Sequence, residues 1–117
     1  MSDLLVKCEK QLIKLSNSSN SEKKLIIKRC RKCLIKAISE IVRNCLIGNI
    51  PMDDCRKNKL KRYKKLLITL ARKSKPLELK RSLILQKGTG FLSILLPIAL
   101  ETVKILIDRF KSKKTVE

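Results

Sequence analysis

Apolar and polar residues alternate along most of the chain with the period of an α-helix. Apolar side chains recur at intervals of three and four residues, a spacing that places them on one face of a helix. The pattern predicts five helices, over residues 3–15, 22–47, 53–73, 77–86 and 91–110. The clearest stripe consists of Ile26, Cys30, Cys33, Leu34, Ala37, Ile38, Ile41 and Cys45.

Polar segments and helix-breaking residues separate the predicted helices. Residues 16–21 contain only Ser and Asn, and the last of them, Ser21, is a predicted N-cap because its hydroxyl can accept a free amide proton. Gly48 and Pro51 predict the end of the second helix, since glycine accepts the left-handed conformation after a helix and proline prevents continuation.

Similar signals delimit the later helices. Asp53 or Asp54 is predicted to cap the third helix, and a Ser-Lys-Pro segment at 74–76 ends it. Pro97 is expected to kink the last helix, because it removes one backbone hydrogen bond. Residues 111–117 are expected to fray.

We therefore expect an all-α protein of four or five helices. The predicted organisation is an N-terminal helix with a Ser/Asn linker (1–21), a basic helical body (22–87), and a glycine hinge with a kinked apolar helix and basic tail (88–117). A small bundle is expected to form within residues 22–86. The near absence of aromatic residues, 3% of the chain, argues against folds that stack bases on aromatic side chains.

Charge points to the class of partner. The chain has 29 Lys and Arg residues against 10 Asp and Glu, for a net charge of +19. This excess predicts a polyanion, either nucleic acid or an anionic membrane surface. Unpaired like charges destabilise a helix, and a polyanion relieves that repulsion while releasing counterions. The ordinary alternative is a solvated face that keeps the protein soluble. The predicted phosphate contacts are Arg56, Lys57, Lys59, Lys61, Arg62, Lys64, Lys65, Arg72 and Lys73.

No pattern of residues indicates an enzyme, a metal site or a cofactor. The chain has no histidine, which excludes His-based catalysis and metal binding. Five cysteines are present, and Cys30 and Cys33 form a CxxC pair, but the spacings to Cys45 and Cys55 are not those of a common zinc ribbon. Cysteines at helical spacing among Ile and Leu behave as small hydrophobes. Without a signal-peptide pattern, we expect reduced thiols in the cytosol or nucleus.

The last predicted helix begins with an uncharged stretch that has two interpretations. Residues 88–100 carry no charge, but these thirteen residues are shorter than the about 20 that a membrane-spanning helix needs. The segment is either the central core helix of a bundle, or a docking segment for capsid or membrane that the hinge releases. The predicted docking residues are Phe91, Leu92, Ile94, Leu95, Leu96 and Pro97.

Two parts of the sequence resemble viral proteins. In residues 80–98, a basic stretch, two glycines and a Leu/Ile-Pro run resemble the precursor of the adenovirus core peptide Mu. A helix ending in Gly-Asn-Ile-Pro at 48–51, a Lys-rich helix with Arg-Tyr-Lys at 62–64, and the segment 83–92 resemble small basic proteins of adintoviruses and Maverick/Polinton elements. The chain departs from the Mu precursor in being rich in Lys and more apolar.

The resemblance implies a virion-associated protein that binds and condenses double-stranded DNA. It places the protein in the virion and in the host nucleus or cytoplasm. It also implies that an adenovirus-type cysteine protease cuts between Thr89 and Gly90. The alternative explanation of the glycines is a plain interhelical turn. DNA contacts are expected to be independent of sequence, because no pattern of base-reading side chains is present. Two alternatives remain: a membrane-active helical protein, and a host-directed helical interaction module.

Overall fold

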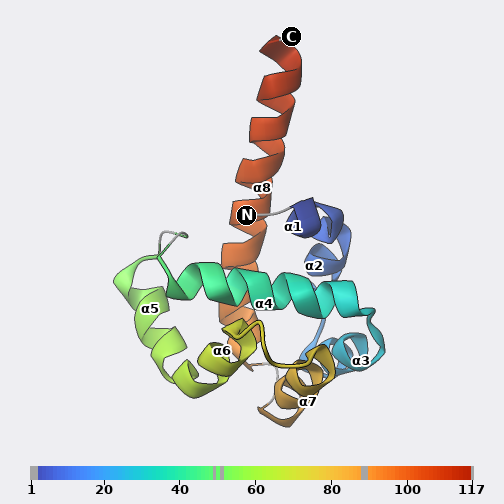
Figure 1. Ribbon diagram of the computed structural model, residues 1–117, viewed down its shortest axis with the longest axis vertical. Helices are drawn as coiled ribbons and strands as arrows, with labels where there is room; N and C mark the ends of the chain where they lie inside the picture. The colour runs from blue at the N-terminus through green and yellow to red at the C-terminus, as the bar shows by residue number, and fades with distance from the viewer. Residues whose placement is uncertain (1–2, 49, 51, 88–89, 117) are drawn as a thin grey trace.

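The computed structural model describes residues 3–48, 50, 52–87 and 90–116, and within them the regular secondary structure is α-helical, without strands (Figure 1). This confirms the all-α prediction. The predicted count of four or five helices is wrong, because the described residues form eight. Their bounds are α1 Asp3–Lys7, α2 Glu9–Ser16, α3 Asn20–Arg29, α4 Lys32–Leu46, α5 Asp54–Lys61, α6 Lys64–Ala71, α7 Leu77–Lys87 and α8 Gly90–Val116.

The extra helices arise because each of the first three predicted helices is divided into two. The divisions fall at Cys8, at Cys30–Arg31 and at Arg62–Tyr63. Cys30 and Arg31 have extended backbones, with ψ of 157° and 160°. None of these positions carries the Gly or Pro that would predict a break from sequence.

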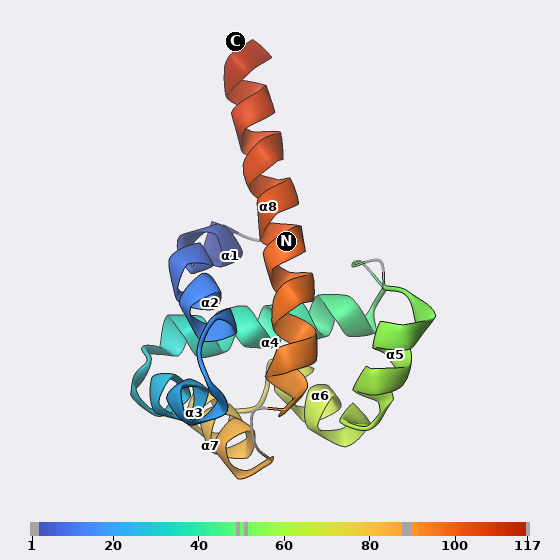
Figure 2. The same ribbon diagram turned by 180° about the vertical axis from the view of Figure 1, so that it is seen from behind.

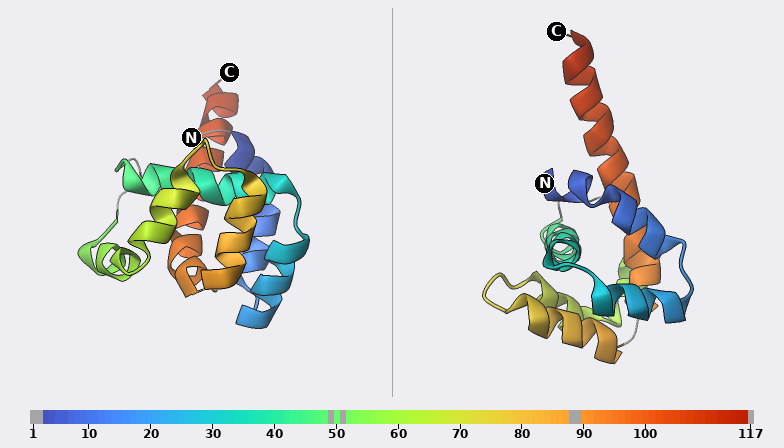
Figure 3. Two further views of the ribbon diagram at one scale, coloured as in Figure 1. Left: turned by 60° about the horizontal axis from the view of Figure 1, so that its bottom comes forward. Right: turned by 90° about the vertical axis from the view of Figure 1, so that its right-hand side faces the viewer.

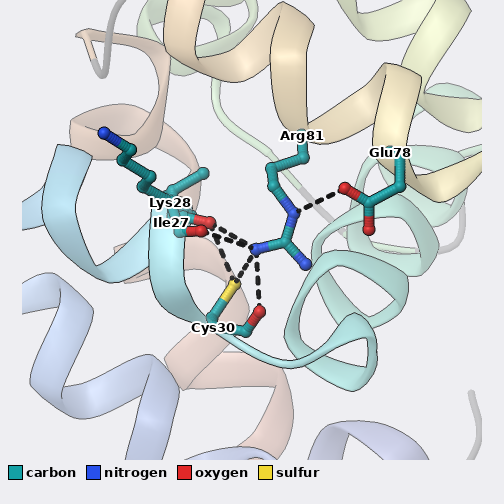
Figure 4. A network of polar contacts seen from close by, with 5 residues as sticks. All are labelled: Ile27, Lys28, Cys30, Glu78 and Arg81. Atoms are coloured by element: carbon teal, nitrogen blue, oxygen red, sulfur yellow. Dashed lines mark hydrogen bonds and ion pairs between the residues drawn. The ribbon is translucent and has the colours of Figure 1, made fainter.

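Arg81 of α7 satisfies the end of α3 at the second division (Figure 4). Its Nη1 donates to the carbonyl oxygens of Ile27 and Cys30, both at 2.7 Å, and more weakly to that of Lys28 at 3.3 Å. The Arg81 Nε forms an ion pair with the Glu78 carboxylate at 3.3 Å. The last carbonyls of a helix have no partner within the helix, and a cation is favourable there. A contact from a helix about fifty residues away therefore stabilises the end of α3.

Local caps define several other helix ends. Ser19, and not the predicted Ser21, caps α3: its Oγ accepts from the Glu22 amide at 3.3 Å and donates to the Glu22 carboxylate at 3.1 Å, which satisfies one free amide of the first turn. Asp53 caps α5 by accepting from the Arg56 amide at 2.8 Å. Gly48 follows α4 with φ of +83°, as predicted.

The helices pack in two layers. α4 lies against α6 and α7, whereas α8 lies against α2, α1 and α5. α4 and α8 cross on opposite sides of the molecule, as the front and back views show (Figures 1 and 2). Seen from the side, they stand apart in separate layers (Figure 3). α3 joins the layers by contacting both α2 and α7.

One hydrophobic core connects all three predicted segments of the chain. Leu5, Leu12 and Leu15 from the N-terminal helices lie in the same cluster as Ile38 of α4 and Phe91 of α8. All five side chains are at most 1% exposed. The bundle predicted within residues 22–86 therefore also includes α1 and α2, which precede it in the sequence, and α8, which follows it.

The C-terminal half of α8 projects beyond this body (Figures 1 and 3). The helix has 27 residues and continues to Val116, past the predicted end at 110. Pro97 lies inside it, and the kink predicted there stays a prediction. No helix in the described part of the chain is long and apolar enough to cross a membrane.

Candidate nucleic-acid interface

Seven of the nine basic residues singled out from the sequence lie on α5, the bend after it and the start of α6. We call residues 56–65 the basic elbow. Tyr63 lies at the bend with φ of −107° and ψ of 16°, and its amide donates to the Leu60 carbonyl at 2.9 Å instead of continuing the α-helical pattern. Leu60, Leu66 and Leu67 are 5–7% exposed. Burial of these leucines directs the intervening cations of both helices toward solvent.

α8 packs against the basic elbow and contacts it at Tyr63 and Arg56. The Tyr63 and Phe91 rings pack with centroids 6.1 Å apart at a tilt of 52°, an arrangement that aromatic pairs favour. The Tyr63 hydroxyl lies so close to Gly90 that a Cβ there would approach it to 2.8 Å. Arg56 and Glu101 of α8 form an ion pair with both N–O distances at 3.4 Å. The bend is thus fixed by contacts at Tyr63 and Arg56.

The structure separates Arg56 from the other predicted phosphate contacts. Its side chain is 34% exposed, and its charge is offset by Glu101, a pairing that raises the pKa of the Arg56 guanidinium. The other eight are exposed. None of these eight forms an ion pair with any described residue. They are Lys57, Lys59, Lys61, Arg62, Lys64, Lys65, Arg72 and Lys73.

Two open hollows flank the bend. One, of about 420 Å³, is lined by Cys55, Asn58, Lys59, Arg62, Tyr63 and Ile94. The other, of about 520 Å³, is lined by Lys61, Arg62, Tyr63, Lys64, Lys65 and Leu66. Arg62 and Tyr63 belong to both hollows, so the five cations from Lys59 to Lys65 surround one surface. Arg72 and Lys73 follow the far end of α6, and Lys73 lines a different cavity.

Most of the predicted docking segment is interior. Phe91, Leu92, Leu95 and Leu96 are 0–1% exposed, which favours the core-helix interpretation. Ile94 is half-buried and Pro97 is exposed. In the folded chain, capsid or membrane docking through the buried Phe91, Leu92, Leu95 and Leu96 would require α8 to leave the core.

The predicted cleavage site lies at the start of α8. Gly90 is its exposed first residue, whereas Thr89 lies outside the described residues. The elbow touches this position through Tyr63. A protease would therefore have to work beside the packed Tyr63–Phe91 pair.

The cysteines are free thiols. Cys8 is 3% exposed, and Cys30, Cys33 and Cys45 are half-buried against the core, in keeping with their predicted packing role. Burial, with a smaller contribution from Cys33, raises the pKa of Cys8 to about 11, and burial raises that of Cys45 to about 11. The described residues contain no group of His, Cys, Asp and Glu side chains suited to a metal ion.

A second basic cluster was missed in the sequence. Lys80 is 3% exposed, and its Nζ donates to the Ser39 hydroxyl at 2.7 Å. Arg43 lies nearby, with its Nε donating to the Ala71 carbonyl at 3.0 Å. In the sequence these residues belong to three separate segments of a lysine-rich chain, so no local pattern distinguished Lys80 from a solvated lysine.

No protein-family model, curated protein or solved structure matches the chain.

Proposed function

We propose that the protein binds the phosphate backbone of double-stranded DNA, without sequence preference, through the basic elbow. The observation that carries the proposal is the set of exposed cations on both arms of a fixed bend. Seven of the nine predicted contacts fall within residues 56–65, and six of these seven have no ion-pair partner among the described residues. This arrangement leaves them available to an external polyanion.

The energy of such binding comes mainly from counterion release. Each phosphate that the elbow neutralises frees condensed cations from the duplex, which makes affinity fall steeply with salt. Two features make the elbow a better surface than a straight lysine-rich helix. The bend spreads the cations around two hollows, and the packing of Tyr63 on α8 fixes that spread before DNA arrives.

We further propose that the protein acts as a virion-associated DNA-binding component of an adenovirus-like element. Support comes from the resemblance in the sequence and from the basic elbow together. The packing of α8 in the core supports a folded DNA-binding protein over a membrane-active peptide. Any capsid contact in the folded state would then use surfaces other than the buried Phe91, Leu92, Leu95 and Leu96.

A salt titration of DNA affinity tests the proposal. In a variant with Lys57, Lys61, Lys64 and Lys65 changed to Gln, affinity for random duplex DNA should fall, and the slope of log K against log salt should become shallower by up to about 0.9 per lost phosphate contact. Electrophoretic titration at several salt concentrations measures both quantities.

A matched control separates the elbow from the overall charge. Changing four exposed lysines of α2 and α3, Lys10, Lys14, Lys24 and Lys28, to Gln removes the same number of charges. This control should keep the parent slope. Equal losses in the two variants would show that binding follows net charge, and the elbow assignment would fail.

A further inference from the structure

A small cavity beside α4 concentrates positive charge away from the elbow. It has a volume of about 300 Å³ and lies between α4, α7, the connection that joins α6 to α7, and Leu4 of α1. That connection and α7 lie on one side of α4 (Figure 3). We call it the Lys80 cavity. Its cationic lining residues are Lys36, Arg43, Lys73, Lys75 and Lys80.

The buried part of the Lys80 cavity is a fixed hydrogen-bond network. The Ser39 hydroxyl donates to the Leu70 carbonyl, so its lone pairs are free to accept from the Lys80 ammonium at 2.7 Å. Arg43 is held by the Ala71 carbonyl at 3.0 Å. Two cationic groups are thus positioned by backbone carbonyls and one hydroxyl.

This arrangement costs energy in the absence of an anion. Burial, and secondarily the charge of Arg43, lowers the pKa of the Lys80 ammonium, because a desolvated cation beside another cation is disfavoured. Ser39 accounts for only one of the three N–H donors of Lys80. Among the described residues that line the cavity, five are cationic and one, Glu40, is a carboxylate.

From this geometry we propose that the Lys80 cavity binds a phosphate oxyanion carrying more than one negative charge. Lys80 and Arg43 form its buried part, and Lys36, Lys73 and Lys75 approach from the more exposed side. Charge-assisted hydrogen bonds from ammonium and guanidinium groups to phosphate are the strong class of such bonds. The volume of about 300 Å³ is at the lower limit of the about 300–1,000 Å³ usual for small-ligand sites, and it leaves room for a phosphate or diphosphate group.

Such a phosphate could belong to a small phosphorylated molecule or to a nucleic-acid backbone. The site itself does not depend on the proposed elbow function. The probe is inorganic pyrophosphate, titrated calorimetrically into the full chain at constant ionic strength. We expect saturable binding at one site.

Variants on both sides of the cavity test the assignment. Lys80→Met removes the buried charge. The double variant Lys36→Gln and Lys75→Gln removes two charges that are more accessible to solvent, so it should leave the core undisturbed. Each should raise the dissociation constant for pyrophosphate by about tenfold or more, the size expected for lost charge-assisted bonds. The pair Lys57→Gln and Lys61→Gln in the elbow is the matched control and should leave it unchanged.

Three results would overturn the proposal. The first is that sodium chloride of equal ionic strength abolishes pyrophosphate binding. The second is that the elbow control loses as much pyrophosphate affinity as the cavity variants, and the third is that the Lys36/Lys75 pair keeps the parent affinity. The source of the phosphate follows from a second arm with duplex DNA. If the Lys36/Lys75 pair weakens duplex binding as much as pyrophosphate binding, the site holds a backbone phosphate. If duplex binding is unchanged while pyrophosphate binding falls, the site serves a small molecule.

Discussion

Arg81→Met should destabilise the protein strongly, because Arg81 of α7 donates hydrogen bonds to the carboxyl end of α3. The Arg81 side chain is 13% exposed. Its Nη1 donates to the carbonyls of Ile27 and Cys30 at 2.7 Å. Methionine keeps most of the aliphatic length and supplies no donor, so these carbonyls lose their bonds to Arg81 while the neighbouring packing is largely retained.

The expected loss follows from those bonds. A hydrogen bond from a charged donor contributes about 1.5–3 kcal/mol. Two short bonds of this kind and a weaker one to the Lys28 carbonyl are lost. Water replaces part of them, because the Ile27 and Cys30 carbonyls are only partly buried. We therefore expect the free energy of unfolding to fall by about 3 kcal/mol, which corresponds to a decrease of about 10 °C in melting temperature for a domain of this size.

Urea and thermal unfolding followed by circular dichroism measure this change. Glu78→Gln is the control, because Glu78 is 65% exposed and a surface ion pair contributes at most about 1 kcal/mol. Arg81→Lys should fall between the two, since an ammonium keeps the charge but lacks the planar fork. If the free energy of unfolding of Arg81→Met lies within about 0.5 kcal/mol of that of the parent, a typical surface effect, the Arg81 contacts do not stabilise the break between α3 and α4.

Two further predictions concern the core and the hinge. Leu67 is 5% exposed, and Leu67→Asp should lower the free energy of unfolding by several kcal/mol because it buries an unpaired charge. Ile68 is 37% exposed, and Ile68→Asp should lower it by about 1 kcal/mol or less. Equal effects in thermal unfolding would show that α6 does not bury Leu67 against the core. Mass spectrometry of purified particles should find a new N-terminus at Gly90, and recovery of only the intact 117-residue chain would leave the glycines as a turn.

Signals that are local in sequence predicted the fold correctly where the structure is set locally. Gly48 ends α4 in the left-handed conformation, Asp53 caps α5, and the helix predicted at 77–86 is α7. These features depend on one residue and its immediate neighbours, so periodicity and cap chemistry were sufficient to find them.

The missed features depend on distant contacts. The break at Cys30 is completed by Arg81, and Tyr63 at the elbow packs on Phe91. The burial of Lys80 requires Ser39, which lies 41 residues earlier. In each case the sequence contains the residue, but only the packed chain shows its partner. The exposed cations of the elbow were predictable for the opposite reason, since exposure needs no partner.

Because α8 is packed in the core, cleavage at Gly90 and release of an apolar peptide are separate events, although the sequence predicts them together. Cutting the peptide bond before Gly90 removes the covalent link and leaves the core contacts in place. Phe91, Leu92, Leu95 and Leu96 are each at most 1% exposed, and full burial of such a side chain contributes about 1.5–3 kcal/mol. The α8 peptide should therefore stay bound to the cut body, with Phe91 still supporting Tyr63. Cleavage would then leave the elbow intact, and release would need a second event that opens the core.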